Sequence, residues 1–476
     1  MVIILSGGLV KLFLIENNKM TSSQNLEKGA HNLLKNCANL LTDQKLIIIS
    51  EDPSLGWYSS DITHYIKKAA TEMGIKTSIL EVGEPQNDSK SKLTDIIEDF
   101  DCVLFFARIG DQDRFEKSHF KTKKVMSYVR NLENLGSTFG HTHHHSLIEL
   151  KKAISEKFKR ENNINYSTDE ITVGAGGKHV IYNLMMATLN KDDEVIIPAP
   201  YWVSYPDIVL LAGANPVVIE CSEDQGFKLT AKDLESVITN NTKWLILNSP
   251  SNPTGACYSE QEIKNLAMVL KRNPHVNILS DDIYEHVVYE DFKFFTMAQI
   301  PELKNKVVTM NGVSKSYAMT GWRIGYAGGS KELIKAVAKI QSQSTTNPSS
   351  ISQAAAVEAL NGNQDFISIR SKAFQERRDF VVNSLNEING ISCIKPDGAF
   401  YVFPNCKALL GKKDKLGKKL ENDTDFVQSL LENNNVAVVQ GSAFGLDGFF
   451  RISYATSMSN LEKAMQRLKE FCDSLV

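Results

Sequence analysis

The 476-residue sequence lacks the features that mark membrane-spanning, nucleic-acid-binding and disulfide-stabilised proteins. No apolar run reaches the roughly 18 residues that a membrane helix needs. The formal net charge is -3, so no excess of basic residues indicates a nucleic-acid partner or an anionic membrane surface. The seven cysteines are scattered and include no C-x-x-C pair, which favours reduced thiols in the cytoplasm over a disulfide framework.

The first residues also lack an export signal. The stretch Met1 to Leu14 is apolar but is interrupted by Gly7, Gly8 and Lys11, and no small-residue cleavage site follows it. Met20 precedes the polar segment TSSQN, which is typical of a protein start. We therefore expect residues 1–19 to be an upstream extension of the reading frame.

Residues 20–146 have the alternating strand and helix signals of a small αβ domain. Apolar, β-branched runs at Lys45 to Ser50, Thr77 to Val82 and Cys102 to Ala107 predict buried strands, and the stretch from Asp61 to Met73 has helical spacing. Alternation of strand and helix predicts a Rossmann-like parallel sheet. No motif in this domain indicates its function.

Two polar segments of this domain are candidates for a ligand-binding or metal site. Arg108 to Arg114 follows a predicted strand, at the sheet edge where α/β proteins bind ligands, but a solvated loop is the interpretation that we favour. The tract His141 to His145 has no Cys, Asp or Glu at ligand spacing, so we expect an exposed loop and no metal site.

From Leu147 onward, strand and helix signals alternate over a longer stretch. This pattern predicts an α/β large domain with a mainly parallel sheet at residues 147–360. A long charged helix from Phe366 to Leu385 then precedes four strand-like pieces, ISCI, AFYVF, VAVVQ and FFRISYA. Residues 361–476 are therefore predicted to form a small α+β C-terminal domain.

The chemistry is concentrated in the segment NGVSKSYAMTGWRIGY, residues 311–326. A predicted strand delivers Ser314 and Lys315 into a loop, and Arg323 follows eight residues after the lysine. The guanidinium fork of arginine matches phosphate oxygens, and a lysine amine becomes reactive when burial lowers its pKa. Such a segment could hold a phosphorylated cofactor beside a reactive lysine.

This segment closely resembles the S-K-x-[FY]-x-M-x-G-[WY]-R signature of class I aminotransferases, which are pyridoxal-phosphate enzymes of fold type I. The resemblance covers about residues 147–476, and segments such as QSQSTTNPSSISQAA are most similar to the prokaryotic aspartate aminotransferase branch. It implies pyridoxal 5'-phosphate as cofactor, bound as a Schiff base to Lys315, with Ser314 and Arg323 near its phosphate. Lys315 would also carry the proton during the reaction.

Further motifs resemble those of the family in the same order. In SDDIYEH, Asp281 is implied to pair with the cofactor's ring nitrogen and Tyr284 to donate to its phenolic oxygen, while Asp282 stands where the family usually has Glu. In SPSNPTG, Asn252 would share that phenolic oxygen. In PAPYWVSYP, Trp202 would stack on the ring.

Two more motifs complete the implied site. Gly176, Gly177 and Lys178 resemble the small-small-Lys turn whose backbone N–H groups reach the phosphate at a helix N-terminus. In FRISYATS, Arg451 would hold the substrate α-carboxylate, and Trp202 and Asn252 would also contact substrate.

The resemblance implies ping-pong transamination between an amino acid, with aspartate expected, and a 2-oxo acid, with 2-oxoglutarate expected. It also implies a cytoplasmic homodimer. The sequence departs from the family before Leu147, where the K-Y-T-P-x-x-G segment is missing and its Tyr falls on His141. Two alternatives therefore stay open: a fusion that binds the cofactor but is catalytically impaired, and another pyridoxal-phosphate reaction such as that of a lyase.

Overall fold

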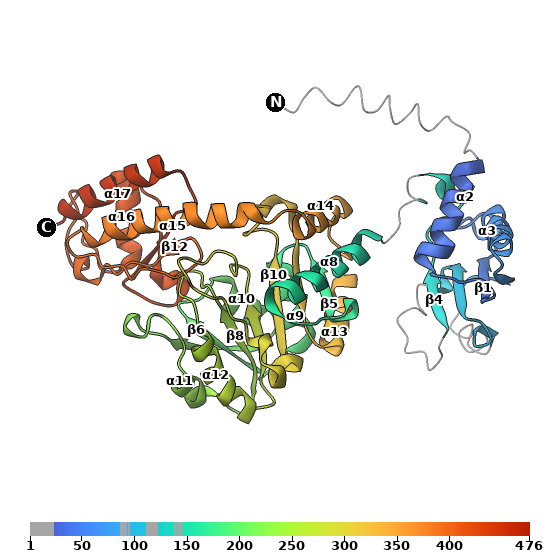
Figure 1. Ribbon diagram of the computed structural model, residues 1–476, viewed down its shortest axis with the longest axis horizontal. Helices are drawn as coiled ribbons and strands as arrows, with labels where there is room; N and C mark the ends of the chain where they lie inside the picture. The colour runs from blue at the N-terminus through green and yellow to red at the C-terminus, as the bar shows by residue number, and fades with distance from the viewer. Residues whose placement is uncertain (1–22, 86–92, 94–95, 111–121, 138–139, 141–144) are drawn as a thin grey trace, which may run out of the picture. The chain divides into compact units, whose positions relative to one another are not determined.

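The computed structural model describes residues 23–85, 93, 96–110, 122–137, 140 and 145–476 (Figure 1). The chain divides into two compact units, Met1–Ser146 and Leu147–Val476. The extension predicted at residues 1–19 and most of the histidine tract lie outside the described residues. The division of the second unit at about residue 360 stays a prediction.

The first unit is a parallel four-stranded sheet with helices, which confirms the predicted αβ fold. The strands pair in the order β2-β1-β3-β4. The elements are α2 (Ser23–His31), β1 (Lys45–Glu51), α3 (Ser60–Glu72), β2 (Lys76–Val82), β3 (Cys102–Phe106), β4 (Lys123–Met126) and α6 (Leu132–Gly136).

The two central strands of this sheet, β1 and β3, are buried on both faces, which explains why they are apolar without a polar side. Leu46 and Ile48 of β1 pack with α2 and α3, whereas Ile47 and Ile49 point into a second cluster on the opposite face. Successive side chains of a strand alternate between faces, so a continuous apolar run is what a doubly covered strand requires.

The charged segment after β3 is not simply a solvated loop at its first residue. Arg108 Nε donates to the Glu51 carboxylate at 2.9 Å, and Glu51 is only 1% exposed. The Arg108 guanidinium also lies 4.9 Å from the centre of the Trp57 ring. This part of our interpretation was wrong because Arg108 neutralises a buried acid, and Asp111, Asp113 and Arg114 lie outside the described residues.

The second unit is built on a seven-stranded sheet in the order β5-β11-β10-β9-β8-β6-β7. Only β11 runs antiparallel to its neighbours, so the predicted mainly parallel sheet is confirmed. The strands are β5 (Ile171–Gly174), β6 (Glu194–Ala199), β7 (Asn215–Glu220), β8 (Thr242–Asn248), β9 (Asn277–Asp281), β10 (Val307–Gly312) and β11 (Gly325–Gly328).

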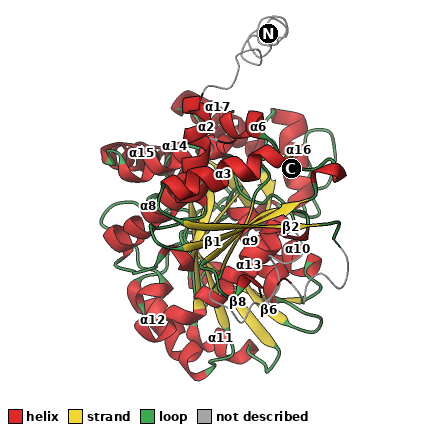
Figure 2. Cartoon of the chain, turned by 90° about the vertical axis from the view of Figure 1, so that its right-hand side faces the viewer, coloured by secondary structure: helices red, strands yellow, loops and turns green. Residues whose placement is uncertain are grey.

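Helices cover both faces of this sheet. Figure 2 shows α11 and α12 on one side of β8 and α9, α10 and α13 on the other. Leu245 and Leu247 of β8 share a core with α11 and α12, and Trp244 and Ile246 share a core with α9, α10 and α13. The helices are α8 (His145–Asn162), α9 (Gly177–Thr188), α10 (Ser204–Leu211), α11 (Ala231–Val237), α12 (Glu260–Arg272), α13 (Lys331–Ser342) and α14 (Ser350–Asn361).

The C-terminal part of this unit begins with the long helix α15 (Asp365–Asn386). It continues with β12 (Tyr401–Val402), α16 (Asp423–Asn434), β13 (Val439–Gln440), β14 (Phe450–Ser453) and α17 (Met458–Asp473). The short strands pair antiparallel in the order β12-β14-β13. Side chains of β12 and β14 share a core with α15, α16 and α17.

One predicted strand of this region was wrong. The run ISCI contributes only an isolated bridge, between Ser392 and Asn405. Its Ile391 and Cys393 are buried in the helical core, so their apolar character reflects packing rather than strand pairing.

Among the residues that the structure describes, no helix is both long enough and apolar enough to cross a membrane.

Candidate active site

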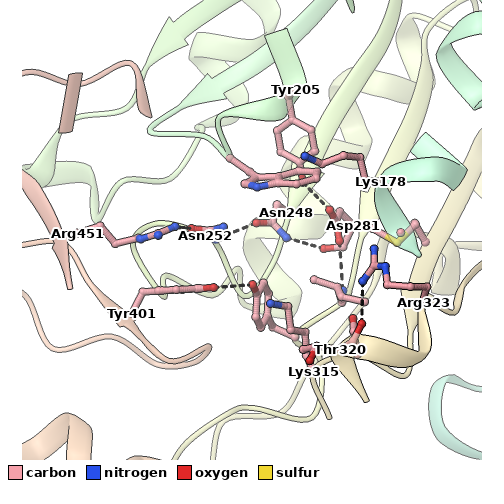
Figure 3. Close-up of a pocket in the computed structure, with 16 residues that line it drawn as sticks. Lys178, Tyr205, Asn248, Asn252, Asp281, Lys315, Thr320, Arg323, Tyr401 and Arg451 are labelled. Atoms are coloured by element: carbon pink, nitrogen blue, oxygen red, sulfur yellow. Dashed lines mark hydrogen bonds between the residues drawn. The ribbon is translucent and has the colours of Figure 1, made fainter. Parts of the chain in front are cut away.

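The strands β8, β9 and β10 end on the same edge of the large sheet, at Asn248, Asp281 and Gly312. Ligands of open α/β sheets bind outside the carboxyl ends of their strands. A cavity of about 310 Å³ lies at this edge (Figure 3).

All but one of the predicted site residues line this cavity. They are Gly177, Lys178, Trp202, Asn252, Asp281, Tyr284, Ser314, Lys315, Arg323 and Arg451. The remaining one, Gly176, precedes α9 and lies against Arg323. Six lining residues were not predicted: Tyr205, Asn248, Ile283, Met310, Thr320 and Tyr401.

Lys315 projects into the cavity from the loop that follows β10. Its Nζ lies 5.5 Å from the centre of the Tyr284 ring and 5.4 Å from that of Phe400, and within the described part of the chain it makes no hydrogen bond or ion pair. Burial lowers the pKa of the Lys315 amine, the charges of Arg451 and Arg323 lower it further, and Asp281 opposes them. A larger fraction of the amine is therefore neutral, as a nucleophile or base requires.

Asp281 ends β9 and is almost fully buried. Its Oδ2 accepts a 2.5 Å hydrogen bond from the Tyr205 hydroxyl, and its Oδ1 accepts from the backbone N–H of Ile283 at 3.3 Å. Burial raises the pKa of Asp281 to about 6, although these hydrogen bonds and the charge of Lys315 lower it. The carboxyl group is thus poised to become a carboxylate when a further positive partner is provided.

Asn252 and Arg451 meet on the other side of the cavity. Arg451 Nη1 donates to Asn252 Oδ1 at 2.8 Å, whereas the buried Arg451 Nε has no partner among the described residues. The guanidinium lies 4.7 Å from the centre of the Tyr401 ring and 4.9 Å from that of Phe444. A buried guanidinium with free donors is suited to bind a carboxylate.

The opposite end of the cavity is formed by the N-terminus of α9 and the loop before β11. Gly176 has φ 94°, and a Cβ there would lie 2.2 Å from Arg323 Nη2. Gly325 is equally constrained, because a Cβ there would lie 2.3 Å from the backbone nitrogen of Gly177. With Lys178, these residues bring cationic groups and free N–H groups of a helix N-terminus together, which is the composition of a phosphate site.

Two aromatic side chains, Trp202 and Tyr205, form an aromatic wall of the cavity. The Trp202 ring lies edge-on to Tyr205, with ring centres 5.3 Å apart, and the Nζ of Lys178 lies 5.0 Å from the centre of the Trp202 ring. Both rings come from the segment PAPYWVSYP, which runs from the end of β6 into the first turn of α10.

The most informative residues that sequence reasoning missed are Asn248, Tyr205 and Tyr401. Asn248 Nδ2 donates to the backbone oxygen of Asp281 at 2.8 Å, and its Oδ1 accepts from the backbone N–H of Asn252 at 2.8 Å, so it fixes two site residues. The Tyr401 hydroxyl lies 2.9 Å from that of Tyr284 (Figure 3). Asn248 ends an apolar strand, and that position at the carboxyl edge was the one signal that could have identified it.

A second polar cluster lies beside the site. The ligand atoms of Glu161, Glu285 and His286 approach one another closely enough for a metal ion. However, the buried ammonium group of Lys157 forms ion pairs with both carboxylates. Lys157 therefore supplies the positive charge that a cation would bring, and the predicted absence of a metal site stays a prediction.

Comparison with known proteins identifies the family. The family model described as aminotransferase class I and II matches residues 112–468. The chain belongs to this family of aminotransferases. As an aminotransferase it is an enzyme, and membership confirms the predicted fold and reaction class and disfavours the alternatives of a lyase or an impaired fusion.

Individual relatives of this aminotransferase are similar over most of their own length. A probable aspartate/prephenate aminotransferase of Rickettsia felis is 58% identical over 327 residues, which are 68% of this chain and 80% of the relative. The aspartate aminotransferase of Rhizobium meliloti strain 1021 is also 58% identical, over 69% of this chain and 80% of the relative.

Solved structures give the same result. The crystal structure of the Rhizobium meliloti aspartate aminotransferase aligns with a TM-score of 0.68 at 58% identity, covering 69% of this aminotransferase and 82% of that chain. The Thermus thermophilus aspartate aminotransferase with maleate aligns with a TM-score of 0.63 at 40% identity, covering 68% and 81%.

Proposed function

We propose that this cavity binds pyridoxal 5'-phosphate through Lys315 and exchanges the amino group of aspartate with a 2-oxo acid, 2-oxoglutarate being the expected acceptor. The observation that carries the proposal is the convergence of three groups in one cavity: the unpartnered amine of Lys315, the buried Asp281 and the incompletely bonded Arg451. The family supports transamination, and the names of the relatives support aspartate.

The residues present fit this cofactor. Lys178, Ser314, Arg323 and the N-terminus of α9 are the proposed ligands of its phosphate, and Gly176 leaves space there that a side chain would fill. Gly177 contributes to the same end of the cavity. A dianionic group is well matched to two cationic side chains and free N–H groups.

The rest of the cavity matches the ring of the cofactor. Asp281 is proposed to bind the ring nitrogen, Tyr284 and Asn252 the phenolic oxygen, and Trp202 the face of the ring. A carboxyl group with a pKa raised to about 6 by burial gains most from a positive neighbour, because that neighbour restores the carboxylate.

When bound, pyridoxal phosphate supplies an electron sink for charge that develops at the substrate α-carbon. Lys315 Nζ is proposed to take the proton from that carbon and to return one to the cofactor side, because its lowered pKa leaves it able to act as a base. Arg451 is proposed to bind the α-carboxylate with its unsatisfied donors.

A cytoplasmic homodimer is part of the same proposal. Helices α9 and α10, with the N-cap residue of α10, expose the large apolar side chains Met186, Val203, Leu210 and Leu211, and the last two are 58% and 68% exposed. Such a patch is typical of a protein interface. All seven cysteines are free, which fits a reducing compartment.

The experiment is an absorbance spectrum of the purified protein with pyridoxal phosphate, before and after addition of aspartate. We expect a visible band that moves to the near ultraviolet with aspartate and returns with 2-oxoglutarate. Lys315→Ala should abolish the covalent band and lower kcat by roughly 10⁴-fold or more, because Lys315 provides both the covalent anchor and the proton carrier.

Lys304→Ala is the matched control. Lys304 is a lysine of the same unit that contacts Asn165 and the ring of Tyr166, away from the cavity. This variant should keep the band and the aspartate response. A wild-type protein with no band would reject the cofactor site, and a band that responds to other amino acids but not to aspartate would reject the substrate.

A further inference from the structure

Tyr401 contacts both the residue proposed to bind the cofactor's phenolic oxygen and the residue proposed to bind the substrate carboxylate. Its hydroxyl lies 2.9 Å from that of Tyr284, the proposed partner of the phenolic oxygen. Its ring lies 4.7 Å from the guanidinium of Arg451, the proposed carboxylate clamp. Figure 3 shows Tyr401 on the same side of the cavity as Arg451, with its hydrogen bond directed toward the Lys315 side.

The contacts of Tyr401 make its hydroxyl sensitive to the charge of Arg451. Burial raises the pKa of Tyr401, and the hydrogen bond with Tyr284 and the positive charge of Arg451 lower it. Burial likewise raises the pKa of Tyr284 well above its ordinary value, and among the nearby groups Arg451 lowers it. A carboxylate bound to Arg451 would cancel this positive charge, so both hydroxyl groups would become weaker acids and weaker donors.

We propose that Tyr401 is a positioning residue that transmits occupancy of Arg451 by a substrate carboxylate to the hydroxyl of Tyr284. The inference rests on the proposed function, because Tyr284 must contact the cofactor for the signal to be seen. Tyr401 contacts both Tyr284 and Arg451. The rings of Tyr401 and Tyr284 are nearly perpendicular, with an interplanar angle of 83°.

The other charged groups around the tyrosine pair are few and can be held constant. Asp281 acts on Tyr284 and raises its pKa, and the amine of Lys315 lies 5.5 Å from the centre of the Tyr284 ring. Neither group contacts the guanidinium of Arg451 through a hydrogen bond or ion pair in the described part of the chain. The charge of Arg451 also acts directly on Tyr284 and Lys315 and lowers both pKa values, and Arg451 bonds to Asn252. Removing the Tyr401 hydroxyl therefore interrupts only the hydrogen-bonded connection through Tyr401, and these direct effects remain.

The experiment measures the pH midpoint of the visible band of the cofactor-loaded protein, with and without saturating maleate. Maleate is a dicarboxylate that has no amino group and cannot react. In the wild-type protein maleate should raise the midpoint, because neutralising a nearby cation favours protonated groups. In Tyr401→Phe, which keeps the ring beneath Arg451, the maleate-induced shift should fall to half or less.

The same coupling must be visible in the binding of maleate itself. If maleate raises the wild-type midpoint by one unit, its dissociation constant should differ by roughly tenfold between pH values well below and well above the midpoint. In Tyr401→Phe this difference should be about threefold or less.

The molecule contains a matched control for this substitution. Tyr289 and Tyr454 form a second buried hydroxyl pair, 3.0 Å apart, and the guanidinium of Arg378 lies 4.6 Å from the centre of the Tyr289 ring. None of these residues lines the cavity. Tyr454→Phe removes the same kind of hydrogen bond, so it should lose comparable stability and keep the wild-type response to maleate.

The outcomes separate the two proposals. Equal maleate shifts in wild type and Tyr401→Phe would overturn the role of Tyr401, and so would a loss of the shift in Tyr454→Phe as large as in Tyr401→Phe. Absence of a visible band in the wild-type protein would instead overturn the proposed function. A shift that is lost in Tyr401→Phe alone would establish the connection.

Discussion

Arg378 and Arg451 are two arginines of the second unit, and each lies against the ring of a tyrosine. Arg378 is buried, and Arg451 is partly buried. Arg378, with a fully buried side chain, donates to Glu290, to Asp379 and to the backbone oxygen of Pro396. In the described part of the chain Arg451 donates one side-chain hydrogen bond, to Asn252, and its buried Nε has no partner.

The difference teaches how a structural arginine can be told from one that waits for a ligand. Both side chains have the same chemistry and comparable ring contacts, so cation–π geometry does not distinguish them. What distinguishes them is hydrogen-bond satisfaction, because buried donors are almost always paired in folded proteins. An unpaired donor in a cavity therefore indicates that a ligand completes it.

Of the two arginines, Arg451 is expected to have the larger effect on catalysis, tested by Arg451→Met. Loss of the carboxylate clamp should remove roughly 2–5 kcal/mol of transition-state binding, or about 30- to 5,000-fold in kcat/KM for aspartate. The free energy of unfolding should change by less than about 1 kcal/mol, since only one hydrogen bond is lost. Steady-state kinetics and urea unfolding measure the two quantities, and a mainly structural loss would break the comparison.

The converse effect is expected for Arg378→Met. Several hydrogen bonds to charged groups are lost, although Glu290 and Asp379 are partly solvated, so the free energy of unfolding should fall by roughly 2 kcal/mol. The kcat/KM of the folded enzyme should stay at the wild-type value, because none of these groups lines the cavity. The same two assays apply, and a selective loss of kcat/KM would contradict the assignment.

A smaller effect, on pH dependence, extends the comparison to buried acids. Burial raises the pKa of Asp282 to about 7, and its Oδ2 has no partner among the described residues. A folded-state pKa above the unfolded value means that the folded state binds the proton more tightly. The contribution of Asp282 to the free energy of unfolding is therefore greatest at low pH and declines as pH rises toward 7.

Asp282→Asn should reduce this decline. Between about pH 4 and pH 7 the cofactor-free wild-type protein should lose on the order of 1–3 kcal/mol more than the variant. Urea unfolding at a series of pH values gives the slope directly. Equal slopes for the two proteins would show that folding does not raise the pKa of Asp282.

The sequence predicted the residues of the site better than their contacts. Motifs such as SDDIYEH and SPSNPTG place Asp281 and Asn252 at the ends of apolar strands, and the parallel sheet then brings them to one edge. That much follows from local pattern and from resemblance to the family. The roles of the predicted residues remain proposals until they are measured.

The missed residues depend on contacts between distant segments. Tyr401 and Tyr284 are 117 residues apart in the chain, and Tyr205 and Asp281 are 76 apart. Tyr205 lies in the segment PAPYWVSYP and Tyr401 in the segment AFYVF. A linear pattern does not show which partner each buried hydroxyl group contacts. Likewise, the run ISCI has the composition of a strand, and only the packing of α15 and α17 shows that it is part of a helical core.

The antiparallel strand β11 has a consequence for how the cavity keeps its dimensions. The ladder between β10 and β11 pairs Gly312 with Gly325, and Val313 donates to Ile324, so the segment that carries Lys315 and Arg323 is a loop tied at its base. A single ligand that bonds to Lys315 at one end and to Arg323 at the other would cross-link this loop. Loading the cofactor should then slow amide hydrogen exchange throughout residues 313–324 together, rather than at either anchor alone.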